Sequence, residues 1–146
     1  MKTKHLEAAA AAVSLLIASG PAQATDTGAQ TLGSPSTAMD VFEFTCSDKF
    51  RIAVANVTDT TTLINVAHMR VILEKVGQPV VLQAGTIGVT GEATTSEDVR
   101  LNGGAGTYRA MFVKTANLAE SYTSNLMCSS LTGTPDNPTL ARVQNQ

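Results

Sequence analysis

Short apolar stretches alternate with turn residues along the middle of the chain, between residues 40 and 129. Within these stretches apolar positions recur every second residue, which is the pattern of half-buried strands. The predicted strands are 41–46, 50–57, 66–76, 80–84, 86–89, 99–101, 107–115 and 120–129. Seven to eight short strands, with no helical period outside the first 24 residues, predict an all-β fold that is an antiparallel β-sandwich.

The same alternation assigns side chains to faces. Cys46 is in step with the two phenylalanines of its strand, and Cys128 is in step with Tyr122 and Leu126. This phasing predicts that both cysteines face the core, where they form one buried disulfide. Phe50, Ile52 and Val54 share one face of their strand, and Met69, Val71 and Leu73 are expected to point inward.

Residues 1–24 have the pattern of a signal peptide. A basic start precedes an apolar run over residues 8–19, and small residues lead up to Ala24, after which cleavage is expected. The run is shorter than the roughly 20 residues that span a bilayer, which disfavours a membrane anchor. The sequence therefore predicts a secreted or periplasmic protein with no membrane span in the mature chain.

The segments on either side of the domain, which covers 40–129, are polar and rich in small residues. Residues 25–39 are expected to form a flexible N-terminal arm, and residues 130–146 a flexible C-terminal tail. An arm of this length is long enough to add as a strand to the sheet edge of a neighbouring molecule. However, Leu32 and Met39 are its only large apolar residues, which favours a linker.

Composition narrows the classes of partner and the compartment. The chain has 10 basic and 12 acidic residues and no basic cluster, so nucleic-acid binding is not expected. Two cysteines in an exported chain indicate a disulfide, which closes a loop of about 80 residues. Redox or metal chemistry would need the two thiols close in sequence or joined by other ligands, and neither condition is met.

The sequence contains no signature of an enzyme. His68 is the only histidine beyond the leader, and its phase places it outward on a strand, opposite to Met69. A nucleophile elbow of the form G-x-S-x-G is absent, and one imidazole cannot build a histidine-rich zinc site. We therefore expect a non-enzymatic protein with no cofactor, no metal and no catalytic residue.

Three polar segments are candidate sites. Glu92, Glu97 and Asp98 carry the oxygen ligands that calcium prefers, but their spacing matches no calcium loop and favours a solvated loop. Asn56 begins a glycosylation sequon, which has meaning only in a cell that glycosylates. The glycine-rich segment 102–106 lacks the residues of a phosphate loop and is expected to be a turn with positive φ.

Three elements together resemble a known family. A strand Asp40-Val41-Phe42-Glu43-Phe44 opens the domain, Met69 to Gly77 is a strand that ends in a glycine turn, and Gly106-Thr107-Tyr108 is followed by a late Tyr122. This pattern, over residues 40–128, resembles the bacterial pre-peptidase C-terminal domain. The resemblance implies a jelly-roll sandwich that accompanies exported enzymes.

Two departures from that family pattern affect what the resemblance implies. Ala67 and Met69 replace acidic residues that are common in the central strand, which puts calcium binding in doubt. The cysteine pair is an addition to the pattern, compatible with first and last strands that lie side by side.

The function expected from these observations is a secreted, non-catalytic binding or accessory module. Both tyrosines, Tyr108 and Tyr122, are phased toward the core, and tryptophan is absent, so no aromatic platform for sugars is expected. The partner would be an unknown protein or an extracellular ligand. The alternative is a self-assembling subunit of an extracellular filament or surface layer, in which the partner is a homo-oligomer of the same chain.

Overall fold

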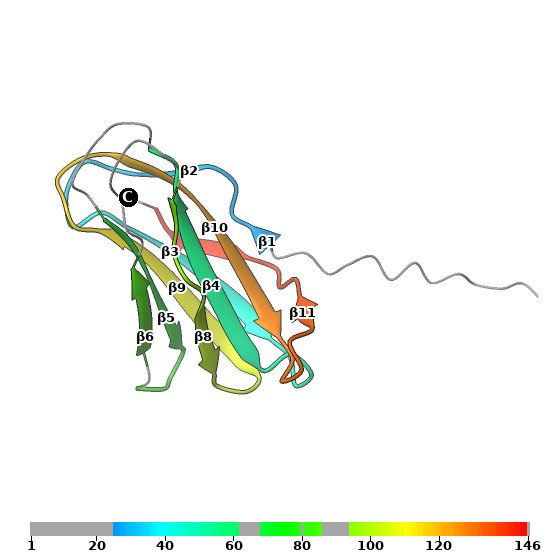
Figure 1. The fold of residues 1–146 in the computed structure, drawn as a ribbon. Coiled ribbons are helices and arrows are strands. Elements are labelled where there is room, and N and C mark those ends of the chain that lie inside the picture. The colour runs from blue at the N-terminus through cyan, green and yellow to red at the C-terminus, as the bar shows by residue number, and fades with distance from the viewer. Residues whose placement is uncertain (1–24, 62–67, 80, 86–93, 146) are drawn as a thin grey trace, which may run out of the picture.

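The computed structural model describes residues 25–61, 68–79, 81–85 and 94–145, which form two antiparallel sheets packed face to face (Figure 1). The strands are β1 (Thr25–Asp26), β2 (Gln30–Leu32), β3 (Met39–Cys46), β4 (Ile52–Asp59), β5 (Met69–Lys75), β6 (Val81–Gly85), β7 (Thr94–Thr95), β8 (Val99–Asn102), β9 (Gly106–Lys114), β10 (Glu120–Ser129), β11 (Pro135–Asp136) and β12 (Ala141–Gln144). The predicted all-β sandwich is confirmed. The predicted strand 86–89 lies outside the described residues.

One sheet has β4 and β10 at its centre, with β7 and β8 beside β4 and with β1, β2 and β11 beside β10. The other sheet has the order β12-β3-β9-β5-β6. Every ladder in the described part of the chain is antiparallel. We call them the seven-stranded and the five-stranded sheet. The jelly-roll arrangement itself stays a prediction.

The core between the sheets contains the side chains that the alternation placed there. Phe42 and Phe44 on β3 and all three predicted residues of β5 are buried. The ring of Phe112 lies 5.8 Å from that of Phe42, edge to face, and 5.0 Å from that of Tyr122, stacked. Because Phe42 and Phe112 belong to the five-stranded sheet and Tyr122 to the other, this aromatic cluster packs the two sheets together.

Ile52 and Val54 share a face of β4, as the alternation predicts, and this face is the outer one. Ala53, Ala55 and Val57 belong to the core, whereas Ile52 and Val54 lie on the opposite face of the strand. Cross-strand partners share a face, and Ala53 is paired with Cys128 and Ala55 with Leu126, both of which are buried. The register with β10 therefore sets the face of β4, and its small residues accommodate large neighbours.

The predicted disulfide is present. Cys46 at the end of β3 and Cys128 near the end of β10 are bonded, with their Cα atoms 5.5 Å apart and both residues almost fully buried. These strands belong to opposite sheets, so the bond crosses the sandwich. The idea that the first and last predicted strands lie side by side is therefore wrong, because they face each other.

The flexible N-terminal arm and flexible C-terminal tail expected from the sequence are also wrong. β1 and β2 pair with β10, and Leu32 is completely buried in the core. β11 pairs with the end of β10, and β12 pairs with β3. Both ends of the described chain thus extend the sheets, which raises the number of strand segments to twelve among the described residues.

A buried polar link joins the two sheets and both ends of the described chain. The Asp40 carboxylate on β3 is fully buried and accepts hydrogen bonds from the Tyr122 hydroxyl and from the Arg142 guanidinium, each at 2.7 Å. Arg142 also donates to the side chain of Gln30 at 2.7 Å and lies over the ring of Phe42. A charge inside a protein needs such partners, so these contacts hold β12 and β2 in place.

We predict that reduction of the disulfide destabilises the fold. The bond joins residues 82 positions apart, and cross-linking of such a loop contributes about 2–4 kcal/mol to the free energy of unfolding. Denaturant unfolding with and without reductant measures this difference. The double variant Cys46→Ala/Cys128→Ala should be insensitive to reductant. Two thiols that are alkylated in the native, unreduced chain would contradict the assignment.

We predict that the two tyrosines of the chain ionise only when it unfolds. Burial and the hydrogen bond to Asp40 raise the pKa of Tyr122, and burial raises the pKa of Tyr108. A folded-state pKa above the unfolded value near 10 means that stability is lost as the pH rises above about 10. Phenolate absorbance should therefore appear together with loss of circular dichroism, and Tyr122→Phe should halve its amplitude. Ionisation at about pH 10 in the folded state would contradict this.

Candidate functional site

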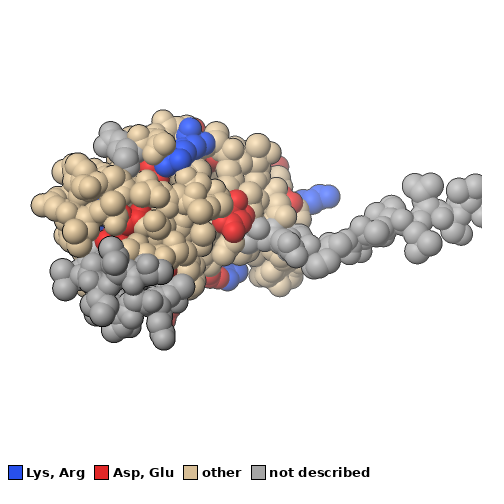
Figure 2. Space-filling view, turned by 90° about the horizontal axis from the view of Figure 1, so that it is seen from above, with Lys and Arg blue, Asp and Glu red and all other residues tan. Residues whose placement is uncertain are grey.

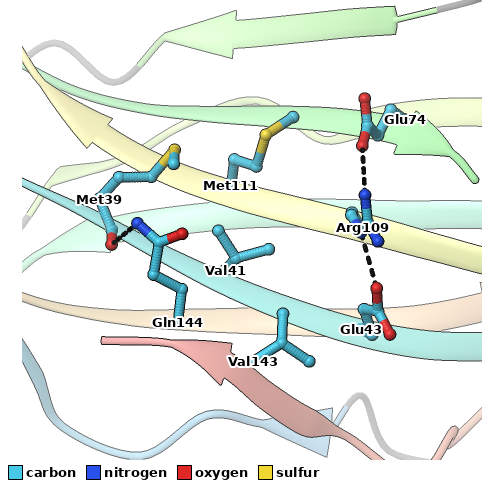
Figure 3. Close-up of a pocket in the computed structure, with 8 residues that line it drawn as sticks. All are labelled: Met39, Val41, Glu43, Glu74, Arg109, Met111, Val143 and Gln144. Atoms are coloured by element: carbon cyan, nitrogen blue, oxygen red, sulfur yellow. Dashed lines mark hydrogen bonds and ion pairs between the residues drawn. The ribbon is translucent and has the colours of Figure 1, made fainter. Parts of the chain in front are cut away.

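An open groove of about 330 Å³ lies on the outer face of the five-stranded sheet (Figure 3). Its lining comes from four strands, β3, β5, β9 and β12. The lining residues are Met39, Val41, Glu43, Glu74, Arg109, Met111, Val143 and Gln144. These residues are far apart in the sequence, and the pairing of the strands brings them together.

The floor of the groove is apolar because β3, β5 and β9 carry apolar side chains on both faces. Val41 is paired with Met111, and Met111 is paired with Ile72, so the three form one cross-strand row on the outer face. Met39 is paired with Val113 in the adjacent row. Val41 is only 6 % exposed although it points away from the core. An outer sheet face with this composition is suited to contact with a partner.

The wall of the groove is β12, which pairs with β3 at the edge of the sheet. Its ladder is irregular between Arg142 and Gln144, and the side chain of Val143 is left 52 % exposed. Gln144 donates a long hydrogen bond of 3.5 Å to the carbonyl oxygen of Met39. Figure 3 shows Val143 beside Val41 on the groove side of this strand. The wall therefore exists only while β12 stays paired.

A charged row closes one end of the groove. Glu43, Arg109 and Glu74 are cross-strand partners on β3, β9 and β5. The guanidinium of Arg109 donates to Glu43 at 2.6 Å and lies 3.7 Å from the carboxylate of Glu74. The hydrogen bond to Glu43, followed by the charges of both carboxylates, raises the pKa of Arg109. Two carboxylates around one guanidinium give the row an excess of negative charge.

The lining of the groove combines apolar and charged side chains, so it suits a ligand that carries both an apolar and a charged group. The thioether side chains of Met39 and Met111 are flexible and polarisable, and they adapt to irregular apolar shapes. The carboxylates of Glu43 and Glu74 accept hydrogen bonds and attract a cation. An aliphatic group that lies on the floor, with a positive charge beside it, matches both parts of the lining.

The residues considered for catalysis and metal binding lie elsewhere. His68 is half-buried and precedes β5 instead of lying within a strand, and its backbone N–H donates to Thr115. Glu97 and Asp98 are exposed, and Asp98 lies 3.6 Å from Arg100. Glu92 lies outside the described residues. No group of three potential metal ligands occurs in the described ranges.

The sequon residue Asn56 lies in the middle of β4 and is half-buried. Its side-chain nitrogen donates to Asp98 at 3.0 Å, and its oxygen accepts from Asn125. A glycan would be attached through this same nitrogen, so glycosylation would change the contact with Asp98.

The glycine-rich segment is a turn, as predicted. Gly104 and Gly106 have φ angles of 78° and 136°, which glycine adopts without strain. The carbonyl of Gly103 accepts from the Lys75 ammonium, and that of Gly104 accepts from the Tyr108 hydroxyl, each at 2.5 Å. These bonds use the buried phenol to fix the loop, which accounts for its sequence without a ligand.

The groove could not be predicted from charged or nucleophilic motifs, because most of its lining is apolar and comes from four separate strands. A signal was available in the predicted strand 107–115, where Met111 and Val113 occupy the face opposite Tyr108 and Phe112. A strand that is apolar on both faces is typical of a covered sheet. β12 gives no such signal, because the segment 130–146 that contains it is polar and holds two prolines and a glycine.

Comparison with family models, curated proteins and solved structures finds no match to this chain. The resemblance to the pre-peptidase C-terminal domain therefore stays a prediction. In the described part of the chain, no helix is long and apolar enough to cross a membrane. On the face seen in Figure 2, charged side chains of both signs are scattered among uncharged ones.

We predict that Arg142 holds the wall of the groove. Arg142→Met removes a partner of the buried Asp40 carboxylate, and loss of one member of a buried pair costs about 3 kcal/mol. Amide hydrogen exchange in β12 should become faster, whereas exchange in β4 should change only with global stability. The matched control is Arg100→Met, which removes an exposed ion pair and should cost less than about 1 kcal/mol. Equal effects of both variants would contradict this role.

Proposed function

We propose that the protein is an exported, non-catalytic binding module that uses the groove on the outer face of the five-stranded sheet. The observation that carries the proposal is the apolar row of Val41, Met111 and Ile72 on the outer face of the sheet, of which Val41 and Met111 line the groove beside a charged row. A sheet whose outer face only meets water normally carries polar residues there. The apolar row is therefore best accounted for by a partner that covers it.

Export is supported by the disulfide. Disulfides persist in oxidising compartments such as the periplasm and the exterior of the cell. The predicted leader and the Cys46–Cys128 bond point to the same compartments. The protein is accordingly proposed to meet its partner in the periplasm or outside the cell.

The proposed ligand is a segment of another exported protein that presents an aliphatic side chain next to a lysine or arginine. The floor has no hydrogen-bonding side chain to satisfy a polar group, which favours an aliphatic one. The negative excess of the Glu43, Arg109 and Glu74 row favours a cation. An acidic segment would meet two carboxylates and would be disfavoured.

A second candidate function is self-association, which a separate observation supports. β1, β2, β11 and β12 cover sheet edges with short strands from the two ends of the chain. Such strands can pair equally well with another copy. This candidate uses the edges of the sandwich, whereas the binding module uses a sheet face.

We predict that hexylammonium binds in the groove better than hexanoate does. Both probes offer the same alkyl chain, but only the ammonium complements Glu43 and Glu74. Methyl resonances of Met39 and Met111 should shift on titration with millimolar hexylammonium, and Met111→Gln should weaken binding about tenfold, equivalent to about 1.4 kcal/mol. The matched control is Leu131→Gln, a residue 67 % exposed and outside the lining. Equal shifts with both probes, or shifts unchanged by Met111→Gln, would overturn the assignment.

A further inference from the structure

Residues 25–32, the part of the N-terminal arm that is meant by the arm from here on, have β10 as their strand partner. β2 pairs with residues 120–122 and β1 with residues 125–126 of that strand. Between the two, Thr27 donates from its backbone N–H to the carbonyl of Ser124 at 3.0 Å, and its hydroxyl also contacts Ser124. The arm therefore follows one edge of β10 over most of its length, as Figure 1 shows.

The arm belongs to a different sheet from the strand that follows it. β2 is part of the seven-stranded sheet, whereas β3 is part of the five-stranded sheet. Residues 33–38 connect the two, and residues 34–37 of this connector are exposed. Because β3 keeps its own ladders with β9 and β12, the arm can leave β10 without breaking the pairing of β3.

Departure of the arm would leave β10 with an open edge and the core with an open site. Leu32 is 0 % exposed and is the large apolar residue that the arm contributes to the core. An uncovered strand edge with an adjacent apolar site is a template for pairing with another chain. The segment that fits this template in length, register and side chains is the same arm from a second copy.

The remaining contacts of the arm would also form when the arm comes from a second copy. Gln30 accepts from Arg142, and the hydroxyl of Thr25 donates to the carbonyl of Pro138 at 3.2 Å. Both partners belong to the C-terminal part that covers β10 and β3. They would receive the arm of a second copy in the same way as their own.

We propose that the N-terminal arm exchanges between copies, so that the arm of one molecule pairs with β10 of another. Reciprocal exchange closes a twofold dimer, whereas successive exchange builds an open chain. Because the arm makes the same contacts with β10 of its own molecule and of another, the protein concentration and the connector determine the balance between monomer and exchanged forms. This inference does not rest on the groove, because the arm contributes no residue to the groove lining.

The connector is the hinge of the exchange. Its six residues span at most about 20 Å when extended, which limits how far apart the exchanging copies can lie. In the folded chain, Lys114 donates to the carbonyl of Ser34 at 2.9 Å, and the side chain of Asn117 accepts from the N–H of Ser36 at 2.7 Å. These bonds keep the connector folded back on its own molecule. Asn117→Ala should therefore increase exchange.

The test is a disulfide between register partners on separate chains. Thr31 and Ser121 are cross-strand partners, and the Cα separation of such partners, about 4.5–5.5 Å, suits a disulfide. Purified full-length export products that carry Thr31→Cys and Ser121→Cys, each with a different tag, are mixed over a hundredfold range of concentration and oxidised. We expect a heterodimer whose yield rises with concentration and rises further, by severalfold, in the Asn117→Ala background.

Two controls separate exchange from collision and from misfolding. A mixture of Thr31→Cys with Asn102→Cys, an exposed position on β8, reports random collision and should give at least tenfold less heterodimer. A single chain with both Thr31→Cys and Ser121→Cys should form the bond internally, which verifies the register, and should then stay monomeric. The proposal is overturned if both mixtures give equal yields, or if the internal bond forms while the mixture of Thr31→Cys and Ser121→Cys chains gives no heterodimer at any concentration. Neither result affects binding of hexylammonium in the groove.

Discussion

Two links between β3 and β10 fix how the two sheets face each other, and the rest of the structure is built around them. One is the Cys46–Cys128 disulfide, and the other is the hydrogen bond between Asp40 and Tyr122. The two linked residues of β3 are as far apart in the sequence as the two linked residues of β10, and they occur in the same order. β3 and β10 therefore run in the same direction in opposite sheets. The core side chains pack in the space that this alignment defines, because a close-packed interior tolerates little sliding of one sheet over the other.

The alignment leaves an edge on each of these two strands, and strands near both ends of the described chain cover those edges. Unpaired N–H and C=O groups at an edge invite pairing with other chains, so their coverage is a structural requirement. β12 covers β3 and forms the wall of the outer groove, while the N-terminal arm and β11 cover β10. Edge protection therefore accounts both for the candidate binding surface and for the element proposed to exchange.

The local pattern was sufficient to predict most strands of the central domain and their inward faces. Phe42, Tyr122 and Met69 lie where their alternation placed them, since burial on one face and period-two geometry are local properties of a strand. For β4 the alternation groups the residues but does not say which face is inward. Its larger apolar residues lie on the outer face, because pairing with β10 aligned Ala53 with Cys128, and small side chains were needed beside large ones.

The sequence by itself determined the fold class, the disulfide partners and the strands that form the core, because each depends on residue type and on spacing along a single segment. Tertiary structure decided the role of the two ends, the assembly of the groove and the placement of the charged row. These features depend on which strands become neighbours. A polar segment such as residues 25–32 carries little local preference, and it becomes a strand because β10 offers an edge and the core offers a site for Leu32. The groove follows from the same cause, since Val143 and Glu74 meet Val41 only through the order β12-β3-β9-β5.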